Sequence, residues 1–168
     1  MTECKMKNAK CKTQNESHYE VTPPTPNRQP SPMYETFEHT ADIGLRVRAA
    51  DLNGLFEDAG RALFSVIVTN LDSVEPVQEV PLRLSAARLD DLLFDWLAEL
   101  LYTFDVRRLL LGEFHVELDD RRLTATARGE PIDPARHQLD MEVKAITYHG
   151  LKLERDGEGW LAEVIVDL

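Results

Sequence analysis

Residues 89–104 read Leu-Asp-Asp-Leu-Leu-Phe-Asp-Trp-Leu-Ala-Glu-Leu-Leu-Tyr-Thr-Phe, the most regular stretch of the 168-residue chain. Apolar residues recur there at three- and four-residue spacing, which gathers them on one side of a helix. The apolar set is Leu89, Leu92, Leu93, Trp96, Leu97, Leu100, Leu101 and Phe104. The pattern predicts a helix buried against the rest of the protein, with its Trp and Leu face serving core packing rather than a ligand pocket.

A second helix is predicted ahead of it, over about residues 52–67. Asp51 is a suitable N-cap because its side chain can accept a hydrogen bond from the first turn. Apolar residues then follow at helical spacing: Leu55, Phe56, Ala59, Leu63, Val66 and Ile67. Gly54 and Gly60 interrupt this pattern, and each weakens the helix by about 1 kcal/mol relative to alanine.

Most other apolar residues alternate with polar ones, which is the period of two expected of strands. Such alternation runs through residues 45–49, 80–84, 114–118 and 123–127, and extended segments follow at 142–149, 151–155 and 160–167. Asp119-Asp120 and residues 156–159 are turn sequences, whereas residues 130–134 break the pattern. Two helices and about seven strands predict an α+β sandwich, with the helices packed on one face of a mostly antiparallel sheet.

Residues 1–33 have a different composition. Residues 21–32 contain five prolines and no apolar periodicity, which favours an extended, solvated chain over packed structure. We therefore expect a disordered proline-rich tail over residues 1–33 and one folded domain over residues 34–168. Both cysteines, Cys4 and Cys11, lie in this tail, so no disulfide framework stabilises the fold, and together with His18 they are short of ligands for a metal knuckle.

The sequence also bears on location and partners. No apolar segment approaches the roughly 18 residues of a membrane span, and the polar first residues lack the apolar core of a secretory signal, so we expect a cytoplasmic protein. The chain carries a net charge of −11, and because five Lys or Arg and three Glu fall in residues 1–33, residues 34–168 carry −13. Such a surface repels nucleic acid. A role with RNA is therefore expected to run through a basic protein partner.

Two segments far apart in sequence carry candidate metal ligands. Asp42 lies in His-Thr-Ala-Asp-Ile-Gly, residues 39–44, at a constrained corner where Gly44 permits a tight turn or the close approach of another segment. The apolar strand 162–166 leads into Asp167-Leu168 at the chain end. If that strand lies beside the corner, two aspartates and the terminal carboxylate meet, and they would repel one another without a cation between them. Oxygen donors of this kind select a hard divalent ion.

A third segment, residues 142–150, contains Lys144 and Tyr148 on the same face of a predicted strand. A lysine in such a strand is either a solvated residue of the outer face or a cation directed at a partner's phosphate or nucleotide.

These three segments, in this order, together with residues 92–102 of the long helix, resemble the archease family. The resemblance covers essentially all of residues 34–168. It implies an accessory protein, without catalytic residues of its own, that activates the GTP-dependent RNA ligase of tRNA splicing and RNA repair. The protein would promote guanylylation of the ligase and its multiple turnover, and would reach RNA only indirectly through the ligase.

The resemblance also assigns residues. Asp42, Asp167 and Leu168 would bind the divalent cation, calcium first with magnesium or manganese as alternatives, and Leu168 would use backbone or terminal oxygens. Lys144 is the functional candidate of its strand. His39 and His149 match motif positions, and for both we expect structural hydrogen bonds.

Two other functions fit the residues. In a metal-assisted phosphoester hydrolase, a cation at Asp42 and Asp167 would activate water beside Lys144 and His149. In a non-enzymatic chaperone or scaffold, the acidic surface would screen a basic client and the metal would be incidental. The hydrolase predicts turnover without a partner, and the scaffold predicts that Asp42 is dispensable.

Overall fold

The computed structural model describes residues 34–39 and 42–168, so the expected tail with Cys4, Cys11 and His18 lies outside the described residues. The elements follow one another as β1 (Tyr34–His39), β2 (Asp42–Ala49), α1 (Leu52–Ile67), the short 3-10 helix η1 (Leu71–Ser73), β3 (Gln78–Ser85), α2 (Leu89–Arg107), β4 (Leu109–Asp119), β5 (Arg122–Pro131), β6 (Ala145–Asp156) and β7 (Gly159–Asp167).

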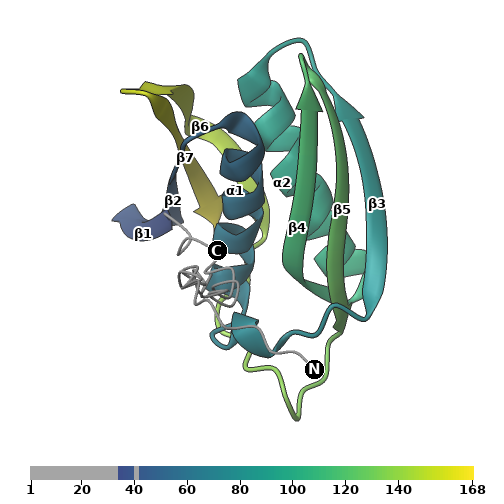
Figure 1. Ribbon diagram of the computed structural model, residues 1–168. Coiled ribbons are helices and arrows are strands. Elements are labelled where there is room, and N and C mark those ends of the chain that lie inside the picture. The colour runs from purple at the N-terminus through teal and green to yellow at the C-terminus, as the bar shows by residue number, and fades with distance from the viewer. Residues whose placement is uncertain (1–33, 40–41) are drawn as a thin grey trace, which may run out of the picture. The chain divides into compact units, whose positions relative to one another are not determined.

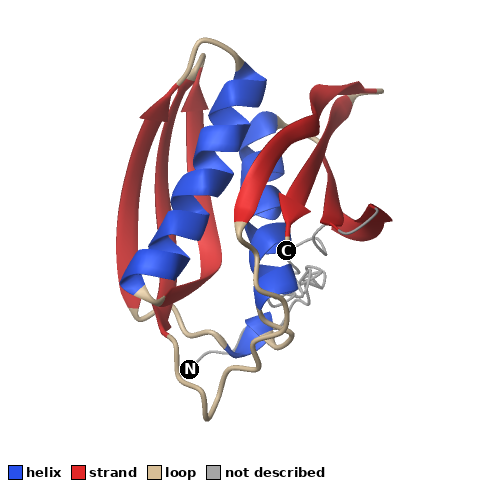
Figure 2. Ribbon diagram, turned by 180° about the vertical axis from the view of Figure 1, so that it is seen from behind, coloured by secondary structure: helices blue, strands red, loops and turns tan. Residues whose placement is uncertain are grey.

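The strands of the described residues form two antiparallel sheets with the helices between them. One sheet has the order β1-β2-β7-β6 and the other β3-β5-β4. Helix α1 packs on β4 and on β2, and helix α2 packs on β6 and on β4 (Figures 1 and 2). The predicted α+β class with two helices is confirmed. The helices, however, lie between two sheets and not on one face of a single sheet. Apolar strand residues cover both sides of the helix layer.

The centre of the molecule is the contact between the two helices. Trp96 of α2 is fully buried, and its indole N–H donates to the carbonyl oxygen of Phe56 in α1 at 3.0 Å. Its ring meets Phe114 of β4 edge to face, at 6.2 Å between ring centroids. A β-carbon on Gly60 would lie 3.2 Å from both Leu100 and Phe114, so the glycine that weakens α1 as an isolated helix allows this close packing.

The helix boundaries agree with the sequence pattern. Helix α1 spans the predicted residues, and the Asp51 side chain accepts from the backbone N–H of Gly54 at 2.9 Å, as expected of an N-cap. Helix α2 ends before Arg108, which caps it with a left-handed φ of 54°. The Arg108 guanidinium lies 5.7 Å from the centre of the Phe104 ring. Neither helix in the described part of the chain is long and apolar enough to cross a membrane.

Three strand predictions need correction. β1 was missed because three of its six residues, Glu35, Thr36 and Glu38, are exposed, which leaves little apolar alternation. The expected break at residues 130–134 begins later, because β5 continues to Pro131. The two extended segments expected at 142–149 and 151–155 form a single strand, β6, which begins at Ala145 and has an irregularity between Thr147 and Lys152 where Gly150 adopts a φ of +70°.

Thr103 of α2 provides a test of core packing. Its hydroxyl oxygen is buried and has no hydrogen-bond partner. In Thr103→Val a methyl group replaces that unsatisfied hydroxyl at nearly constant volume, so we expect the free energy of unfolding in urea to rise by about 1 kcal/mol. Thr124→Val, at an exposed strand position, is the control and should change it little. A clear loss of stability in Thr103→Val would contradict the assignment of an unsatisfied hydroxyl.

Candidate functional site at one end of the four-stranded sheet

The pairing of β2 with β7 brings the two candidate aspartates to the same end of a sheet. Ile43 pairs with Val166, so Asp42, which precedes Ile43, and Asp167, which follows Val166, are the next residues in this register. β7 lies between β2 and β6 in the sheet. The predicted meeting of the corner at Asp42 with the last strand is thus found in the strand order and register.

Lys144 joins the same sheet end from the opposite side of β7. Its backbone N–H donates to the carbonyl oxygen of Asp167 at 2.8 Å, and its side-chain Nζ donates to the carbonyl oxygen of Leu168 at 2.5 Å. The Leu168 side chain is half-buried and packs against the core. Lys144 therefore holds the end of β7 through its backbone and places a positive charge at the main chain of Leu168.

The donors gathered here are all oxygen atoms, and they fit a hard divalent cation. The Asp42 side chain is half-buried and that of Asp167 is exposed. The main-chain oxygen of Leu168 accepts from Lys144 and has a further lone pair, so it could also contact an ion. In the described part of the chain no three His, Cys, Asp or Glu side chains gather closely enough to hold an ion. The candidate site contains two such side chains, and a third ligand could come only from a main-chain oxygen such as that of Leu168.

Gly44 shapes the corner that presents Asp42. Gly44 is not one of the described glycines with a positive φ. It therefore permits the close approach of another side chain, and it is not needed for a tight turn. A β-carbon there would lie 2.1 Å from the Phe37 ring, which covers Gly44 from the facing position of β1. The guanidinium of Arg46 lies 4.9 Å from the centre of the same ring and donates to Glu163 of β7 at 2.6 Å. This arrangement ties β1, β2 and β7 together beside the candidate site.

Tyr148 lies against helix α2. Its ring stacks on Phe94 with 3.9 Å between centroids, yet 57% of the residue remains exposed. Burial raises the pKa of the Tyr148 hydroxyl, and the negative charges of Asp91, Asp95 and Asp90 raise it further. The hydroxyl therefore stays protonated at neutral pH.

The structure describes the two histidines of the motifs to different extents. His39 ends β1, where its backbone pairs with Asp42, and its side chain lies outside what the structure describes. His149 is exposed on β6, and the Thr147 hydroxyl lies 3.5 Å from its carbonyl oxygen. The structural hydrogen bonds expected of these two side chains stay predictions.

A buried ionic cluster, which the sequence pattern did not predict, lies at the end of β5 and in the connection to β6. Glu130 and His137 are 6% and 4% exposed, and His137 Nε2 lies 3.2 Å from Glu130 Oε1. The backbone N–H of Asp133 donates to His137 Nδ1 at 2.9 Å, which places the ring hydrogen on Nε2. Glu130 also accepts from Arg136 at 2.7 Å and from the backbone N–H of Glu75 at 2.7 Å. Pro131 and Pro134 made this region resemble a simple break between strands. The sequence pattern therefore gave no sign of the cluster.

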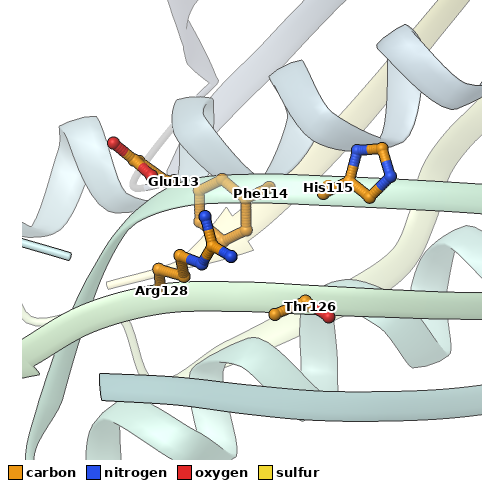
Figure 3. Close-up of a pocket in the computed structure, with 5 residues that line it drawn as sticks. All are labelled: Glu113, Phe114, His115, Thr126 and Arg128. Atoms are coloured by element: carbon orange, nitrogen blue, oxygen red, sulfur yellow. The ribbon is translucent and has the colours of Figure 1, made fainter. Parts of the chain in front are cut away.

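A separate hollow of about 340 Å³ lies on β4 and β5 (Figure 3), lined by Glu113, Phe114, His115, Thr126 and Arg128. Two of its residues, His115 and Arg128, lie close to carboxylates. His115 lies 3.7 Å from Glu57 and 3.6 Å from Glu117, and Arg128 donates to Glu79 at 2.8 Å.

Comparison with known proteins supports the class that this architecture suggests. Residues 34–168 match the archease protein family. Protein archease of Methanopyrus kandleri is 43% identical over 139 residues, which cover 80% of this chain and 99% of the relative. Protein archease of Pyrococcus furiosus is 40% identical over 141 residues, which cover 81% of this chain and 99% of the relative.

Solved structures agree with the sequence comparison. The solution structure of Methanobacterium thermoautotrophicum Protein 1598 matches with a TM-score of 0.71 at 34% identity, covering 81% of this chain and 99% of that one. The crystal structure of an archease, possible chaperone, from Thermotoga maritima matches with a TM-score of 0.58 at 23% identity, covering 80% of this chain and 96% of that one, and shows the same fold.

The fold and site together define an acidic α+β domain that gathers oxygen donors and one lysine at the end of a sheet. The matched family spans the whole of this domain. The chain belongs to the archease family.

The covering of Gly44 by Phe37 can be tested with a double-mutant cycle. Gly44→Ala places a methyl group where the Phe37 ring lies, so the ring must turn away, and we expect the free energy of unfolding to fall by about 1–3 kcal/mol. In a Phe37→Ala background the same change should cost little, because the obstructing ring is gone. Equal costs in both backgrounds, measured by urea unfolding, would contradict this contact.

The buried cluster predicts a specific loss of stability in acid. The hydrogen bond from the Glu75 backbone, helped by Arg136 and His137, holds the pKa of Glu130 below its ordinary value of 4.5. A lowered pKa in the folded state gives stabilisation that is complete above the ordinary value and is lost as the pH falls through the folded value. The difference in unfolding free energy between wild type and Glu130→Gln should therefore narrow from about pH 6 to about pH 3.

Glu79→Gln is the matched control for this measurement. Glu79 pairs with Arg128 at 2.7 Å on the surface, where its side chain is 61% exposed. A surface pair of this kind contributes little to stability, so its difference from wild type should stay small throughout. A difference for Glu130→Gln that does not change with pH would argue against the cluster as the source of acid sensitivity.

Proposed function

We propose that this protein activates a GTP-dependent RNA ligase of tRNA splicing and RNA repair, promoting guanylylation of the ligase and its multiple turnover. Membership of the archease family supports the proposal. The observation that carries it furthest is the sheet end where Lys144, Asp42 and the Asp167-Leu168 segment converge. In this proposal the protein contributes binding and positioning groups, and the ligase performs the chemistry.

We assign a divalent cation to Asp42, Asp167 and the main-chain oxygens of Leu168, with calcium first and magnesium or manganese as alternatives. A bound ion would neutralise the two carboxylates and fix the end of β7. Asp167 is exposed and follows a buried apolar run, residues 161–166 except Glu163, so its carboxylate is presented from a rigid strand. A partner can then reach the site without disturbing the core.

Lys144 is the residue that we assign to contact with the ligase. Its side chain is exposed, and the hydrogen bond from its ammonium to Leu168 keeps the positive charge at the sheet end that carries the candidate carboxylates. A cation in this position is suited to a phosphate of the ligase's nucleotide or of the guanylylated intermediate. Its backbone is fixed by Asp167, so the charge is delivered from a defined place.

The overall charge is consistent with this division of labour. Residues 34–168 carry a net charge of −13, which disfavours direct contact with RNA. In the proposal, RNA is therefore bound by the ligase alone. The proposal also places the protein with the ligase in the cytoplasm.

The proposal is tested by multiple-turnover RNA ligation with the cognate ligase, GTP and manganese, with this protein at substoichiometric amounts. Wild type should stimulate turnover. Asp42→Asn and Asp167→Asn should reduce the stimulation by about tenfold or more, as loss of groups that hold a metal does elsewhere. Lys144→Met should also reduce it, and Lys144→Arg should show whether charge alone suffices.

Asp120→Asn is the matched carboxylate control, because Asp120 is exposed in the hairpin between β4 and β5, away from the sheet end. Calorimetric titration of calcium and manganese reports on the ion without the ligase, and it should lose heat of binding in the Asp42 and Asp167 variants only. Stimulation that survives both aspartate changes would favour the scaffold function. Phosphoester turnover by the purified protein without ligase would favour the hydrolase.

A further inference from the structure

A short extended strap, residues 138–142, leads from the buried cluster toward Lys144. Its backbone is bound to the end of α1: Thr69 N–H donates to Gln138, and Asp140 and Met141 N–H donate to Ile67 and Val66, at 3.0, 2.9 and 3.3 Å. Leu139 also forms an isolated antiparallel bridge with Val68. The strap is therefore held in one conformation although it belongs to no sheet.

Two apolar side chains of this fixed strap are left uncovered. Leu139 is 47% exposed and Met141 is 39% exposed, whereas Val143, the next residue with the same alternation, is 2% exposed. Apolar side chains held in place and left in solvent mark a surface where another molecule binds.

Beside the strap lies a cavity of about 260 Å³ that combines an apolar lining with charged groups. Its apolar residues are Ile67, Phe104, Leu139 and Met141, and its charged residues are Asp105, Arg108, Asp140 and Glu142. The cavity is smaller than the roughly 300–1,000 Å³ of typical small-molecule sites. It has room for one inserted side chain rather than a nucleotide or cofactor.

The charges of this cavity favour a positively charged inserted side chain. Three residues with exposed carboxylates and one arginine line it, and the guanidinium of that arginine lies over the Phe104 ring. A lysine or arginine fits both requirements, because its methylene stem can cover apolar surface while its charged head remains at the acidic rim.

We propose that this cavity, which we term the strap pocket, receives a lysine or arginine from a basic, partly apolar segment of the partner protein. The proposal rests on the proposed function and deepens it, since it assigns the strap pocket as the place where the ligase docks. Glu142 at the rim is two residues from Lys144, which contacts Asp167 and Leu168. A segment bound in the pocket is thereby brought next to the candidate site along one continuous stretch of chain.

The first measurement uses the full-length protein labelled with ¹⁵N and two synthetic peptides. One peptide alternates leucine with lysine and arginine, and the other carries glutamate at every basic position. The basic peptide should shift the amide resonances of residues 138–142, and the acidic peptide should not. Asp140→Lys with Glu142→Lys should weaken binding of the basic peptide by about tenfold or more, because two attractive charges become repulsive.

Matched controls keep this result specific. Glu113→Lys with Glu117→Lys reverses two exposed carboxylates on β4, which are remote from the strap in sequence and lie in the three-stranded sheet. This change should leave binding at the strap nearly unchanged. Met141→Ser should weaken binding without changing charge. Val77→Ser, at an apolar residue that is more exposed than Met141, should not. Shifts centred elsewhere, or equal shifts with both peptides, would overturn the proposal.

The second measurement is the affinity of the purified cognate ligase for the same variants. Weaker binding by the strap variants and unchanged binding by the controls would support docking at the strap pocket. Equal affinity of wild type and the Asp140→Lys, Glu142→Lys variant would overturn that assignment. If the ligase binds no form of the protein while the basic peptide still maps to the strap, the ligase is excluded as partner, the proposed function fails, and the pocket's preference for a basic segment stands.

Discussion

The fold depends on one hydrogen bond inside a dry layer, from the Trp96 indole to the carbonyl oxygen of Phe56. With sheets on both sides, the indole N–H has no access to water, and leaving it unsatisfied would cost about 1–3 kcal/mol. The bond fixes the rotation of α2 against α1, and the edge-to-face contact with Phe114 fixes both against the three-stranded sheet. Gly60 makes this geometry attainable by giving Leu100 and Phe114 the space of a missing side chain.

From this centre the order extends to the candidate site through β7. Ala162, Val164 and Val166 are buried, at 0%, 1% and 0% exposure, and belong to the same core as Trp96. Because side chains alternate along a strand, a strand fixed by three buried residues has a fixed register, and a slip of one residue would turn them all away from the core. The placement of Asp167 next to Asp42 is therefore a consequence of core packing.

Sequence patterns predicted the helices well because their apolar residues follow the helical period over four or more turns. They predicted the meeting of Asp42 and Asp167 only as a conditional statement, since alternation within strands does not reveal which strands are neighbours. β1 carries mostly exposed residues and owes its place to Phe37 over Gly44. The Glu130 and His137 cluster joins residues that look unremarkable as a pair in sequence, and only the folded connection brings them into one buried network.

The acidic character of the chain has a specific meaning in this fold. A uniform negative surface would only repel RNA, but the strap pocket combines carboxylates with apolar side chains, which favours a basic protein segment over a polyanion. The lysine that precedes β6 has the opposite charge and is held at the sheet end by the main chain of Leu168. Only Val143 lies between the strap and Lys144, so one partner can contact both the acidic pocket and the lysine at the sheet end. In the proposed function, this pairing of charges lets an acidic protein act on a phosphate-handling enzyme without binding its nucleic acid.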